Sequence, residues 1–413
     1  MLTDDITKRV SADPTVALLA RGTDIRLSFV IDHSRTDLDI VDGKVSPAEA
    51  GEPAFTLTMD RQTWTAATAA RPAPGDQSLL AMIRDGRVRM EGDRLAFAQH
   101  LQLVRAIVEA MRPLAEPEAP GEASHRPLSM RGEYVRVHVE PWGDCDVFVE
   151  RAGTGLPLIC LATAGSDSRQ YHGLVTETDL TDRYEIIAVD LPWHGKSDPA
   201  WGRRPLDYTL DASSYLGTIV AVVDALGLDE TPILLGSSMA GAAVVEAVAR
   251  HPQLMRGAVA CQAGPRVAGR RTPWLRSPRV NQTLHVPEWT YGLMSPESPR
   301  EFRDRVWWGY SQGGFGTYDA DILYYTTGWD VENVRDLLSP SSPHVVVMSG
   351  AYDTSVPPEA SRELASLIPN SSFRLMPELG HFPHAENPAA FATHLEWALT
   401  TIIDHADREE DRE

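Results

Sequence analysis

Short apolar segments alternate with helical stretches through the last two thirds of the sequence, and this alternation constrains the fold more than any other feature. It is typical of a mostly parallel, doubly wound sheet, because parallel neighbours need a crossover that a helix supplies. A hairpin is predicted just before it, over 134–139 and 146–150. The alternation stops over 265–339, where helix-like segments indicate an insertion. The predicted strands are residues 158–162, 186–189, 233–235, 258–261, 345–348 and 373–376.

A proline-rich segment divides the 413-residue chain into two parts. Residues 113–130 carry four prolines and three glutamates with few large apolar side chains, so we predict an extended linker there. The part before it, residues 1–112, is expected to be a small α+β domain. The doubly wound core is expected over 131–264 and 340–406, with a helical cap over 265–339 between its two halves.

The N-terminal part contains both kinds of secondary-structure pattern. Alternating apolar residues predict strands at 25–31 and 54–59, and a further strand is indicated at 87–91. An amphipathic pattern predicts one long helix over 95–111. Mixed strands and helices without regular alternation favour the α+β class for this domain.

Composition limits the kinds of partner and the cellular compartment that we expect for this protein. The formal charge of −20 disfavours nucleic acid, whose phosphates such a field repels. The three cysteines, Cys145, Cys160 and Cys261, are too few and scattered for a disulfide framework or a metal site. No signal peptide and no membrane span is indicated. We therefore expect a cytoplasmic protein without a metal, with a small molecule as its partner and a homodimer compatible with the sequence.

The motif GSSMAG at 236–241 follows a predicted strand and precedes a predicted helix. A serine on such a turn, flanked two positions away by Gly236 and Ala240, is typical of a nucleophile elbow, whose strained backbone accepts only small neighbours. The Ser238 hydroxyl would then lie at a helix N-terminus, where amide groups favour a developing oxyanion. The alternative is a helix start with a serine cap.

Two further loops supply partners for this serine. Asp353 follows the predicted strand at 345–348, and His381 follows the last predicted strand. A serine hydroxyl needs a histidine base, and a carboxylate orients that histidine. Serine, aspartate and histidine in this order, each just past its own strand, predict a catalytic triad of Ser238, Asp353 and His381; His384 is a second, less favoured candidate for the base.

These motifs together resemble the α/β-hydrolase family, in its capped esterase, lactonase and carbon-carbon-bond hydrolase groups, over roughly residues 131–406. GSSMAG is similar to the family's G-x-S-M-G-G elbow, GAYDTSVP at 350–357 to its acid loop, and GHFPHAENP at 380–388 to its histidine loop. The resemblance implies an α/β fold with a helical cap. A serine at the nucleophile position disfavours the dehalogenase and epoxide hydrolase branches.

Two segments depart from the family pattern. LATAGSDSR at 161–169 stands where the oxyanion loop usually reads H-G. By position, the amides of Ala164 and Met239 are expected to form the oxyanion hole, with Thr163 as an alternative to Ala164. In DLPWHGKS at 190–197, Trp193 stands where glycine is common. Trp193 is therefore a candidate for the pocket floor, or an ordinary packing residue.

The predicted cap is rich in aromatic residues, which favours a bulky apolar or aromatic substrate. Candidate pocket residues there are Trp307, Trp308, Tyr324 and Tyr325, although many cap rings are expected to form ordinary core. Residues 10–112 resemble the sterol-carrier-protein-like fold, through FTLTMD at 55–60 and the GRVRMEGD turn at 86–93. That resemblance implies an apolar groove; the alternative is a packing or dimerisation module.

The sequence thus predicts a serine hydrolase that cleaves an apolar or aromatic ester or lactone through an acyl-enzyme, without any cofactor. The same triad could cleave a carbon-carbon bond next to a ketone, or transfer an acyl group internally as a cyclase acting on a polyketide-like substrate. A non-catalytic ligand-binding protein on a hydrolase scaffold is a further alternative. A lipid carrier, acting through the N-terminal domain, is the last one.

Overall fold

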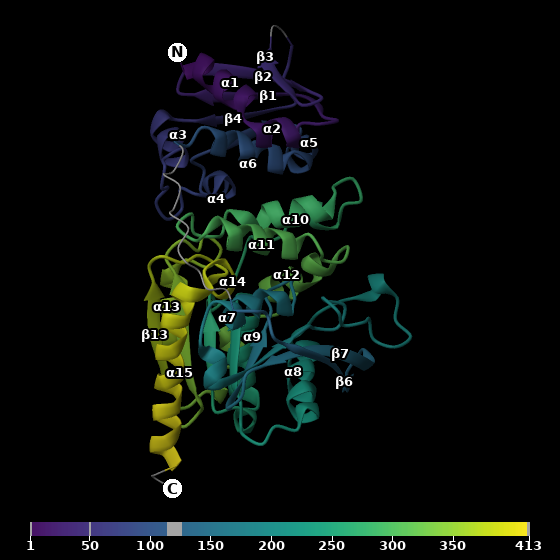
Figure 1. Ribbon diagram of the computed structural model, residues 1–413, viewed down its shortest axis with the longest axis vertical. Coiled ribbons are helices and arrows are strands. Elements are labelled where there is room, and N and C mark those ends of the chain that lie inside the picture. The colour runs from purple at the N-terminus through teal and green to yellow at the C-terminus, as the bar shows by residue number, and fades with distance from the viewer. Residues whose placement is uncertain (1, 49–50, 114–125, 411–413) are drawn as a thin grey trace. The chain divides into compact units, whose positions relative to one another are not determined.

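The computed structural model divides into two compact units, which are described separately (Figure 1). It describes residues 2–48, 51–113 and 126–410. Most of the predicted linker, residues 114–125, lies outside them. The first unit consists of Met1–Gly121 and Ser277–Gly292, and the second of Glu122–Arg276 and Leu293–Glu413. Part of the segment predicted as cap, residues 277–292, therefore belongs to the first unit by its contacts.

The first unit is built on a five-stranded sheet in the order β3-β2-β1-β4-β5. Only β1 and β4 are parallel; the other neighbours are antiparallel. Its strands are β1 (Asp24–Ile31), β2 (Ser34–Val41), β3 (Lys44–Pro47), β4 (Phe55–Met59) and β5 (Arg89–Gly92). Its helices are α1 (Leu2–Ala12), α2 (Pro14–Leu19), α3 (Arg61–Ala67), α4 (Leu79–Arg84), α5 (Arg94–Gln99), α6 (Leu101–Ala110) and α10 (Gln282–Tyr291).

The long helix predicted over 95–111 is wrong, because it is two helices that meet at His100. The backbone of His100 leaves the helical region (φ −112°, ψ 18°), which ends α5, although its N–H still donates to the Ala96 and Phe97 carbonyls. Phe97 in α5 and Ile107 in α6 are both buried in the same core. The apolar pattern therefore continues across the break, which is why periodicity alone does not reveal it.

Helix α10 is held to α6 by a buried ion pair within the first unit. The Arg105 guanidinium donates to Glu288 Oε2 over 2.6 Å, and Glu288 is 4% exposed. Arg105 also contacts Glu109. A cation shared between two carboxylates in a buried setting orients the helices that carry them. This pairing explains why a segment inserted into the hydrolase sequence packs with the N-terminal unit.

The second unit is built on an eight-stranded sheet in the order β13-β12-β11-β10-β8-β9-β7-β6. It is parallel from β13 to β9, and β7 and β6 join antiparallel at one edge. Its strands are β6 (Arg131–Val139), β7 (Gly143–Ala152), β8 (Leu156–Leu161), β9 (Tyr184–Val189), β10 (Ile233–Ser237), β11 (Gly257–Cys261), β12 (His344–Gly350) and β13 (Ser371–Met376). The predicted strand order along the chain and the predicted hairpin are confirmed.

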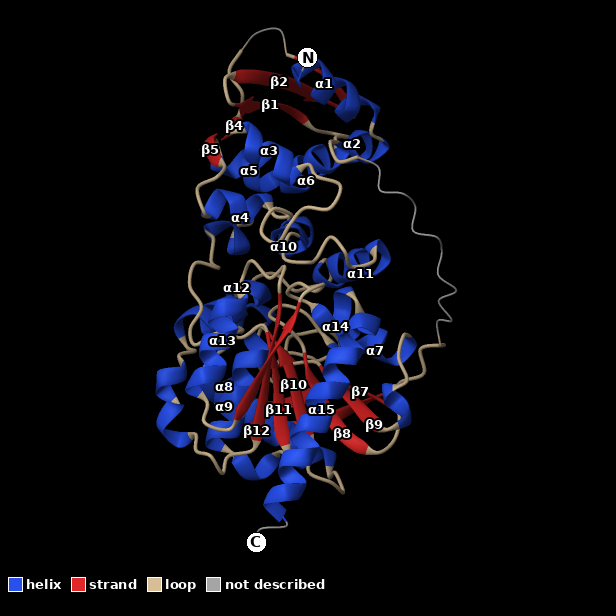
Figure 2. Ribbon diagram, turned by 90° about the vertical axis from the view of Figure 1, so that its left-hand side faces the viewer, coloured by secondary structure: helices blue, strands red, loops and turns tan. Residues whose placement is uncertain are grey.

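Helices cover both faces of this sheet (Figure 2). Side chains of α7 and α15, such as Leu174 and Leu395, share one core with the strand residues Leu158 and Ile233. Strands buried on both faces explain the continuous apolar runs. The helices are α7 (His172–Thr176), α8 (Ala212–Leu226), α9 (Met239–Arg250), α11 (Arg300–Tyr310), α12 (Thr317–Thr327), α13 (Pro358–Leu367), α14 (Pro383–Glu386) and α15 (Pro388–Glu410). Within the described ranges, none of the helices has both the length and the apolar character that a membrane crossing requires.

Candidate active site

Ser238 lies on the sharp turn between β10 and α9. Its backbone has φ 61° and ψ −122°, a strained conformation for a residue with a side chain. A Cβ on Gly236 would lie 2.4 Å from the Ala240 carbonyl oxygen, so the turn has room only for glycine there. The Ser238 amide donates to the Cys261 carbonyl over 2.9 Å. The packed neighbours thus hold the strained turn in place, as a nucleophile elbow requires.

The structure brings Ser238, His381 and Asp353 into one hydrogen-bonded series. His381 Nε2 lies 2.9 Å from Ser238 Oγ, and His381 Nδ1 lies 2.7 Å from Asp353 Oδ2. The other carboxylate oxygen of Asp353 accepts the amides of Ser355 and Val356. All three side chains are at most 4% exposed. Because the carboxylate can only accept, Nδ1 carries its proton, and the lone pair of Nε2 is directed at the serine hydroxyl.

The loop after β8 contains an amide, that of Ala164, which is not used by a hydrogen bond in the described structure. The Thr163 N–H donates to Gln170 Oε1 over 3.1 Å, and the Gly165 N–H donates to Asp321 Oδ2 over 2.6 Å. Within the described ranges, no hydrogen bond uses the N–H of Ala164 or of Met239, the first residue of α9. Of the two residues considered for this loop, Ala164 thus has the amide free to donate to an oxyanion.

Asp321, from helix α12, joins three separate segments at this loop. Besides the Gly165 amide, its carboxylate lies 2.9 Å from His194 Nε2 and accepts the Tyr208 hydroxyl over 2.6 Å. Asp321 is fully buried. A buried carboxylate with three donors is well compensated, and removal of one donor would leave part of its charge unsatisfied. Asp321, on the cap helix α12, therefore holds the loop that contains Ala164 in place.

His194 carries a proton on both ring nitrogens. Its Nδ1 lies 3.0 Å from the Pro192 carbonyl oxygen, which can only accept, and its Nε2 faces the Asp321 carboxylate. Burial alone would lower the pKa of His194, but the Asp321 charge, its hydrogen bond and the Pro192 carbonyl outweigh burial and raise the pKa. His194 and Asp321 thus form a buried ion pair.

Gln262 connects the loops that carry the triad. Its side-chain amide donates to the Gly380 carbonyl over 2.6 Å and accepts the Gly350 amide over 3.0 Å. Its own carbonyl accepts the Tyr325 hydroxyl over 3.2 Å. Gln262 is fully buried and has φ 53°, which a residue with a side chain adopts only when its surroundings require it. It thus fixes the end of β12 to the loop after β13, next to Asp353 and His381.

Tyr325 is the predicted pocket residue that contacts the nucleophile. Burial first, and then the charge of Asp353, raises the pKa of its phenol, whereas the hydrogen bond with Ser238 and the charge of Arg270 act in the opposite direction. Tyr310 packs on Phe382, whose ring lies edge-on against His381, and the Tyr310 hydroxyl lies 2.6 Å from Thr163 Oγ1. Both tyrosines are buried. Buried aromatic rings therefore lie beside the serine, in Tyr325, and beside His381, in Phe382 and Tyr310.

The other predicted pocket residues make different contacts. Tyr324, although adjacent to Tyr325, directs its hydroxyl to Glu246 over 3.3 Å and packs edge-on against Tyr215. Trp193 has φ 68° and packs against Trp142 and Tyr208. Trp307 is half-buried on α11, and Trp308 is 53% exposed beside the Arg169 guanidinium.

His384 does not contact Ser238. Its ring stacks on Tyr171 with 4.6 Å between the centroids, and its Nε2 lies 3.5 Å from Gln170 Oε1. Burial, and then the charge of His381, lowers the pKa of His384 to about 3, so it is neutral near pH 7. His381 is therefore the histidine positioned to act on the serine.

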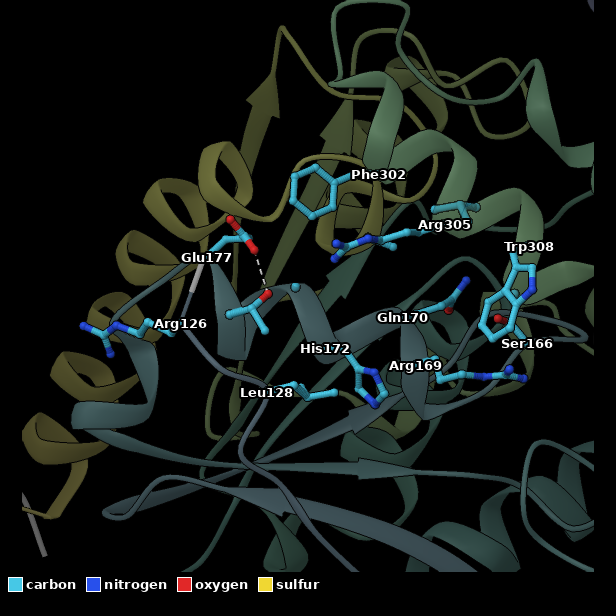
Figure 3. A pocket seen from close by; sticks show the side chains of 15 residues that line it. Arg126, Leu128, Ser166, Arg169, Gln170, His172, Glu177, Phe302, Arg305 and Trp308 are labelled. Carbon is cyan, nitrogen blue, oxygen red and sulfur yellow. Dashed lines mark hydrogen bonds between the residues drawn. The ribbon is translucent and has the colours of Figure 1, made fainter. Parts of the chain in front are cut away.

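Helix α11 and the segment from η1 (Ser168–Tyr171) to α7 enclose a cavity of about 500 Å³ beside the oxyanion loop (Figure 3). Its arginines already have carboxylate partners. Arg169 pairs with Asp167 and Arg305 with Glu301. Its lining includes Phe302, Arg305 and Trp308 from α11 and Arg169, Gln170 and His172 from the facing segment.

Sequence reasoning did not identify Asp321, Gln262 or Gln170. Asp321 lies in a cap helix whose charged and aromatic residues follow no clear period, and Gln262 follows β11 without any motif. A polar residue at the carboxyl end of a parallel strand is the one general signal that could have singled out Gln262.

Fold and site together define a class of enzyme. A model of the Alpha/beta hydrolase family matches residues 158–394, more than half of the chain. The chain belongs to this family, and the α/β-hydrolase fold and enzymatic class predicted from the sequence are confirmed.

The chain is similar at low sequence identity to several named hydrolases. A 2-hydroxymuconate semialdehyde hydrolase of Pseudomonas sp. (strain CF600) is 22% identical over 251 residues, which cover 59% of this chain and 86% of the relative. An esterase from Thermogutta terrifontis has a similar structure, with a TM-score of 0.52 and 21% identity, over 65% of this chain and 99% of its own. The enol-lactonase from Burkholderia xenovorans LB400 reaches a TM-score of 0.53 at 16% identity, over 64% and 99% of the two chains.

Proposed function

We propose that this α/β-hydrolase cleaves an apolar or aromatic ester or lactone through an acyl-enzyme on Ser238. The observation that carries the proposal is the hydrogen-bonded series from Asp353 through His381 to Ser238, buried at the carboxyl edge of the sheet. The buried rings near the triad, Tyr310 and Tyr325 among them, support an apolar or aromatic substrate.

In the first half of the reaction, Ser238 Oγ attacks the carbonyl carbon while His381 Nε2 takes its proton. Asp353 keeps Nδ1–H directed away from the serine and stabilises the imidazolium that forms. The Ala164 and Met239 amides donate to the developing oxyanion. When the carbon-oxygen bond breaks, the leaving alkoxide takes the proton from His381, and the acyl group stays on Ser238.

In the second half, water takes the place of the leaving alcohol. His381 accepts a proton from water as its oxygen attacks the acyl carbon, and the same proton returns to Ser238 Oγ when the acyl-serine bond breaks. The free acid leaves. In a lactone the acyl and alcohol parts are joined, so the product is one hydroxy acid.

The test is hydrolysis of 4-nitrophenyl butyrate by the full chain. Ser238→Ala is expected to lower kcat by on the order of 10⁴-fold or more, because no nucleophile remains. Ser349→Ala is the matched control: this buried serine, on β12, has a hydroxyl without a hydrogen-bond partner in the described structure, so its loss should leave turnover unchanged. Equal rates for Ser238→Ala and the wild type would overturn the proposal.

A second candidate is cleavage of a carbon-carbon bond next to a ketone, and the relatives named 2-hydroxymuconate semialdehyde hydrolase favour it. The same triad would serve that reaction. Incubation with 2-hydroxymuconate semialdehyde, followed by mass spectrometry of the products, separates the two: carbon-carbon cleavage yields two fragments, whereas a pure esterase leaves the molecule intact.

The sterol-carrier likeness of residues 10–112 stays a prediction. The interior of this unit is filled by aromatic pairs, Phe29 with Trp64 and Phe55 with Phe97, at centroid distances of 5.8 and 5.4 Å. Such a filled core supports a packing module more than a lipid carrier. Titration of the full chain with a fluorescent fatty acid tests this, since a carrier should bind the probe in the Ser238→Ala variant as well.

A further inference from the structure

Arg270 is a buried arginine without a carboxylate partner in the described structure. It lies in the loop after β11 and is 5% exposed. Its one hydrogen bond joins Nη2 to the Tyr318 hydroxyl over 3.4 Å, and no described carboxylate lies within 4.0 Å of it. The next residue behaves differently, because Arg271 pairs with Asp319 over 3.2 Å.

An isolated guanidinium is costly to bury. It carries five N–H donors and a charge that cannot be removed near neutral pH. A single long bond to a neutral hydroxyl satisfies neither the charge nor the remaining donors, whereas buried charges in proteins are normally paired. Arg270 therefore has the electrostatic character of a binding group that lacks its anion.

Packing connects Arg270 to the proposed oxyanion loop. The Tyr318 ring, whose hydroxyl meets Arg270, lies directly against Gly165: a Cβ there would come within 2.7 Å of Tyr318 Cδ2. Tyr318 also packs edge-on against Tyr310, with 6.0 Å between the centroids. Gly165 follows Ala164, so the guanidinium lies one ring away from the loop with the free amide.

The charge of Arg270 also reaches the phenols near the nucleophile. Burial raises the pKa of Tyr310 and of Tyr325, and Arg270 acts on both in the opposite direction. Tyr325, whose hydroxyl donates to the Gln262 carbonyl, is the one of the two whose pKa the Ser238 hydroxyl also lowers. The contact through Tyr318 places the cation next to the oxyanion loop, and its electrostatic interaction with Tyr310 and Tyr325 agrees with that position.

We propose that Arg270 is an anion subsite of the active site and that the substrate is an ester or lactone carrying a carboxylate. The inference rests on the proposed ester or lactone hydrolysis and names its substrate class. A guanidinium matches a carboxylate with two parallel hydrogen bonds, and the Tyr318 hydroxyl can add a third. The substrate is then apolar around the scissile carbonyl and charged at one end.

The surroundings favour a single negative charge. Arg271, the adjacent cation, is already paired with Asp319, and the buried carboxylates of Asp321 and Asp353 lie close to the same loop and to the triad. One cation balances a carboxylate, whereas a doubly charged phosphate would leave one charge uncompensated among these acids.

The experiment compares esters that differ only in the end of the acyl chain. 4-Nitrophenyl hemisuccinate ends in a carboxylate, and 4-nitrophenyl 4-methylpentanoate has the same shape with a neutral end. Arg270→Gln is expected to lower kcat/KM for the hemisuccinate by about 10- to 100-fold, the effect of a charge-assisted hydrogen-bonded pair, and to leave the neutral ester within about twofold. Arg270→Lys should retain part of the preference.

Arg266→Gln is the matched control. It removes one positive charge from the same loop, but Arg266 is a largely exposed residue paired with Asp330. Its ratio of hemisuccinate to neutral-ester kcat/KM should equal that of the wild type. If Arg270→Gln lowers kcat/KM equally for both esters, so that their ratio stays at the wild-type value, Arg270 has a purely structural role and the proposal is overturned.

A binding measurement separates this proposal from the proposed function. In the Ser238→Ala background, calorimetric titration with the two esters measures affinity without turnover. Tighter binding of the hemisuccinate that depends on Arg270 supports the subsite even if no ester is hydrolysed by the wild type. If neutral esters are hydrolysed in a reaction that depends on Ser238, but both esters bind with equal affinity, the proposed hydrolase function stands and the proposed anion subsite is wrong.

Discussion

Two histidine-aspartate pairs are buried in the second unit, and the distances within the two pairs are nearly the same. His381 lies 2.7 Å from Asp353, and His194 lies 2.9 Å from Asp321. All four side chains are at most 4% exposed. The difference is the group at the second ring nitrogen. His381 faces the Ser238 hydroxyl, which can donate, whereas His194 faces a carbonyl oxygen, which cannot.

The group opposite the second ring nitrogen therefore decides what such a pair does. Opposite a hydroxyl, the histidine keeps a free lone pair and is able to take a proton. Opposite a carbonyl, both nitrogens donate, and the histidine is a fixed cation. One pair is thus arranged for proton transfer, and the other is arranged to hold cap and core together.

The two carboxylates, Asp353 and Asp321, differ in where their other hydrogen-bond donors come from. Asp353 takes its two amide donors from its own loop, at Ser355 and Val356. Asp321 takes its donors from Gly165 and Tyr208, far away along the chain. Loss of Asp353 should therefore disturb the imidazole it orients, and loss of Asp321 should loosen several segments at once.

The largest expected effect comes from exchanging each histidine for glutamine. His381→Gln should lower kcat for 4-nitrophenyl butyrate by on the order of 10⁴-fold or more, because no base remains for Ser238. His194→Gln should cost less than the ~10²-fold that loss of one oxyanion donor costs, because it only loosens the loop. Steady-state kinetics on both variants measures this. A comparable decrease of kcat in both variants would contradict the different roles assigned to the two histidine-aspartate pairs.

When stability is measured, substitution of Asp321 should have the larger effect, and substitution of the triad residue Asp353 the smaller one. Asp321→Asn leaves the His194 cation buried without its counter-charge and should lower the free energy of unfolding by about 3–5 kcal/mol. Asp353→Asn should be clearly less destabilising, yet should lower kcat by on the order of 10⁴-fold. Urea unfolding followed by tryptophan fluorescence gives the first quantity. A variant of Asp321 as stable as wild type would contradict the ion pair.

The smallest effect is a dependence of stability on pH. Because the folded state raises the pKa of His194, the pair with Asp321 contributes stability that is fully present below the unfolded pKa of about 6.5 and is lost as pH rises through the folded pKa. The contribution is about 1.4 kcal/mol for each pKa unit. Asp190 also acts on His194 and raises its pKa further.

The measurement is the stability difference between wild type and His194→Gln at about pH 6 and about pH 9. It should be larger at pH 6. A difference that stays constant, or that grows with pH, would mean that His194 is neutral in the folded protein.

The position of the proposed triad could be predicted because it depends on topology. Ser238, Asp353 and His381 each follow a strand of a parallel sheet, and the carboxyl ends of such strands share one edge. Short apolar runs located those strands, and small residues marked the elbow. Local sequence was sufficient here because each residue depends on its own strand end.

Residues that depend on distant partners could not be found in this way. Asp321 is one of two acids in its helix, and Arg270 is one of several arginines in its loop. Only the folded chain reveals which of them is buried and what faces it. The same holds for residues 277–292, which lie within the hydrolase sequence but pack with the first unit.

The strand β2 was missed for a related reason. Its inward Leu38 and Ile40 alternate with Asp37 and Asp39, so no apolar run marks it. Its pairing with β1 and the burial of one face stabilise the strand. Strands buried on both faces, as in the second unit, were predicted more readily than this one-sided strand.

The central claim is that His381, and not His194, activates Ser238. It is tested most directly by labelling with a fluorophosphonate, followed by mass spectrometry of the labelled peptide. We expect a single adduct on Ser238 in wild type and in His194→Gln, formed at similar rates, and almost none in His381→Gln. Equal labelling in His381→Gln, or an adduct on a different residue in wild type, would contradict it.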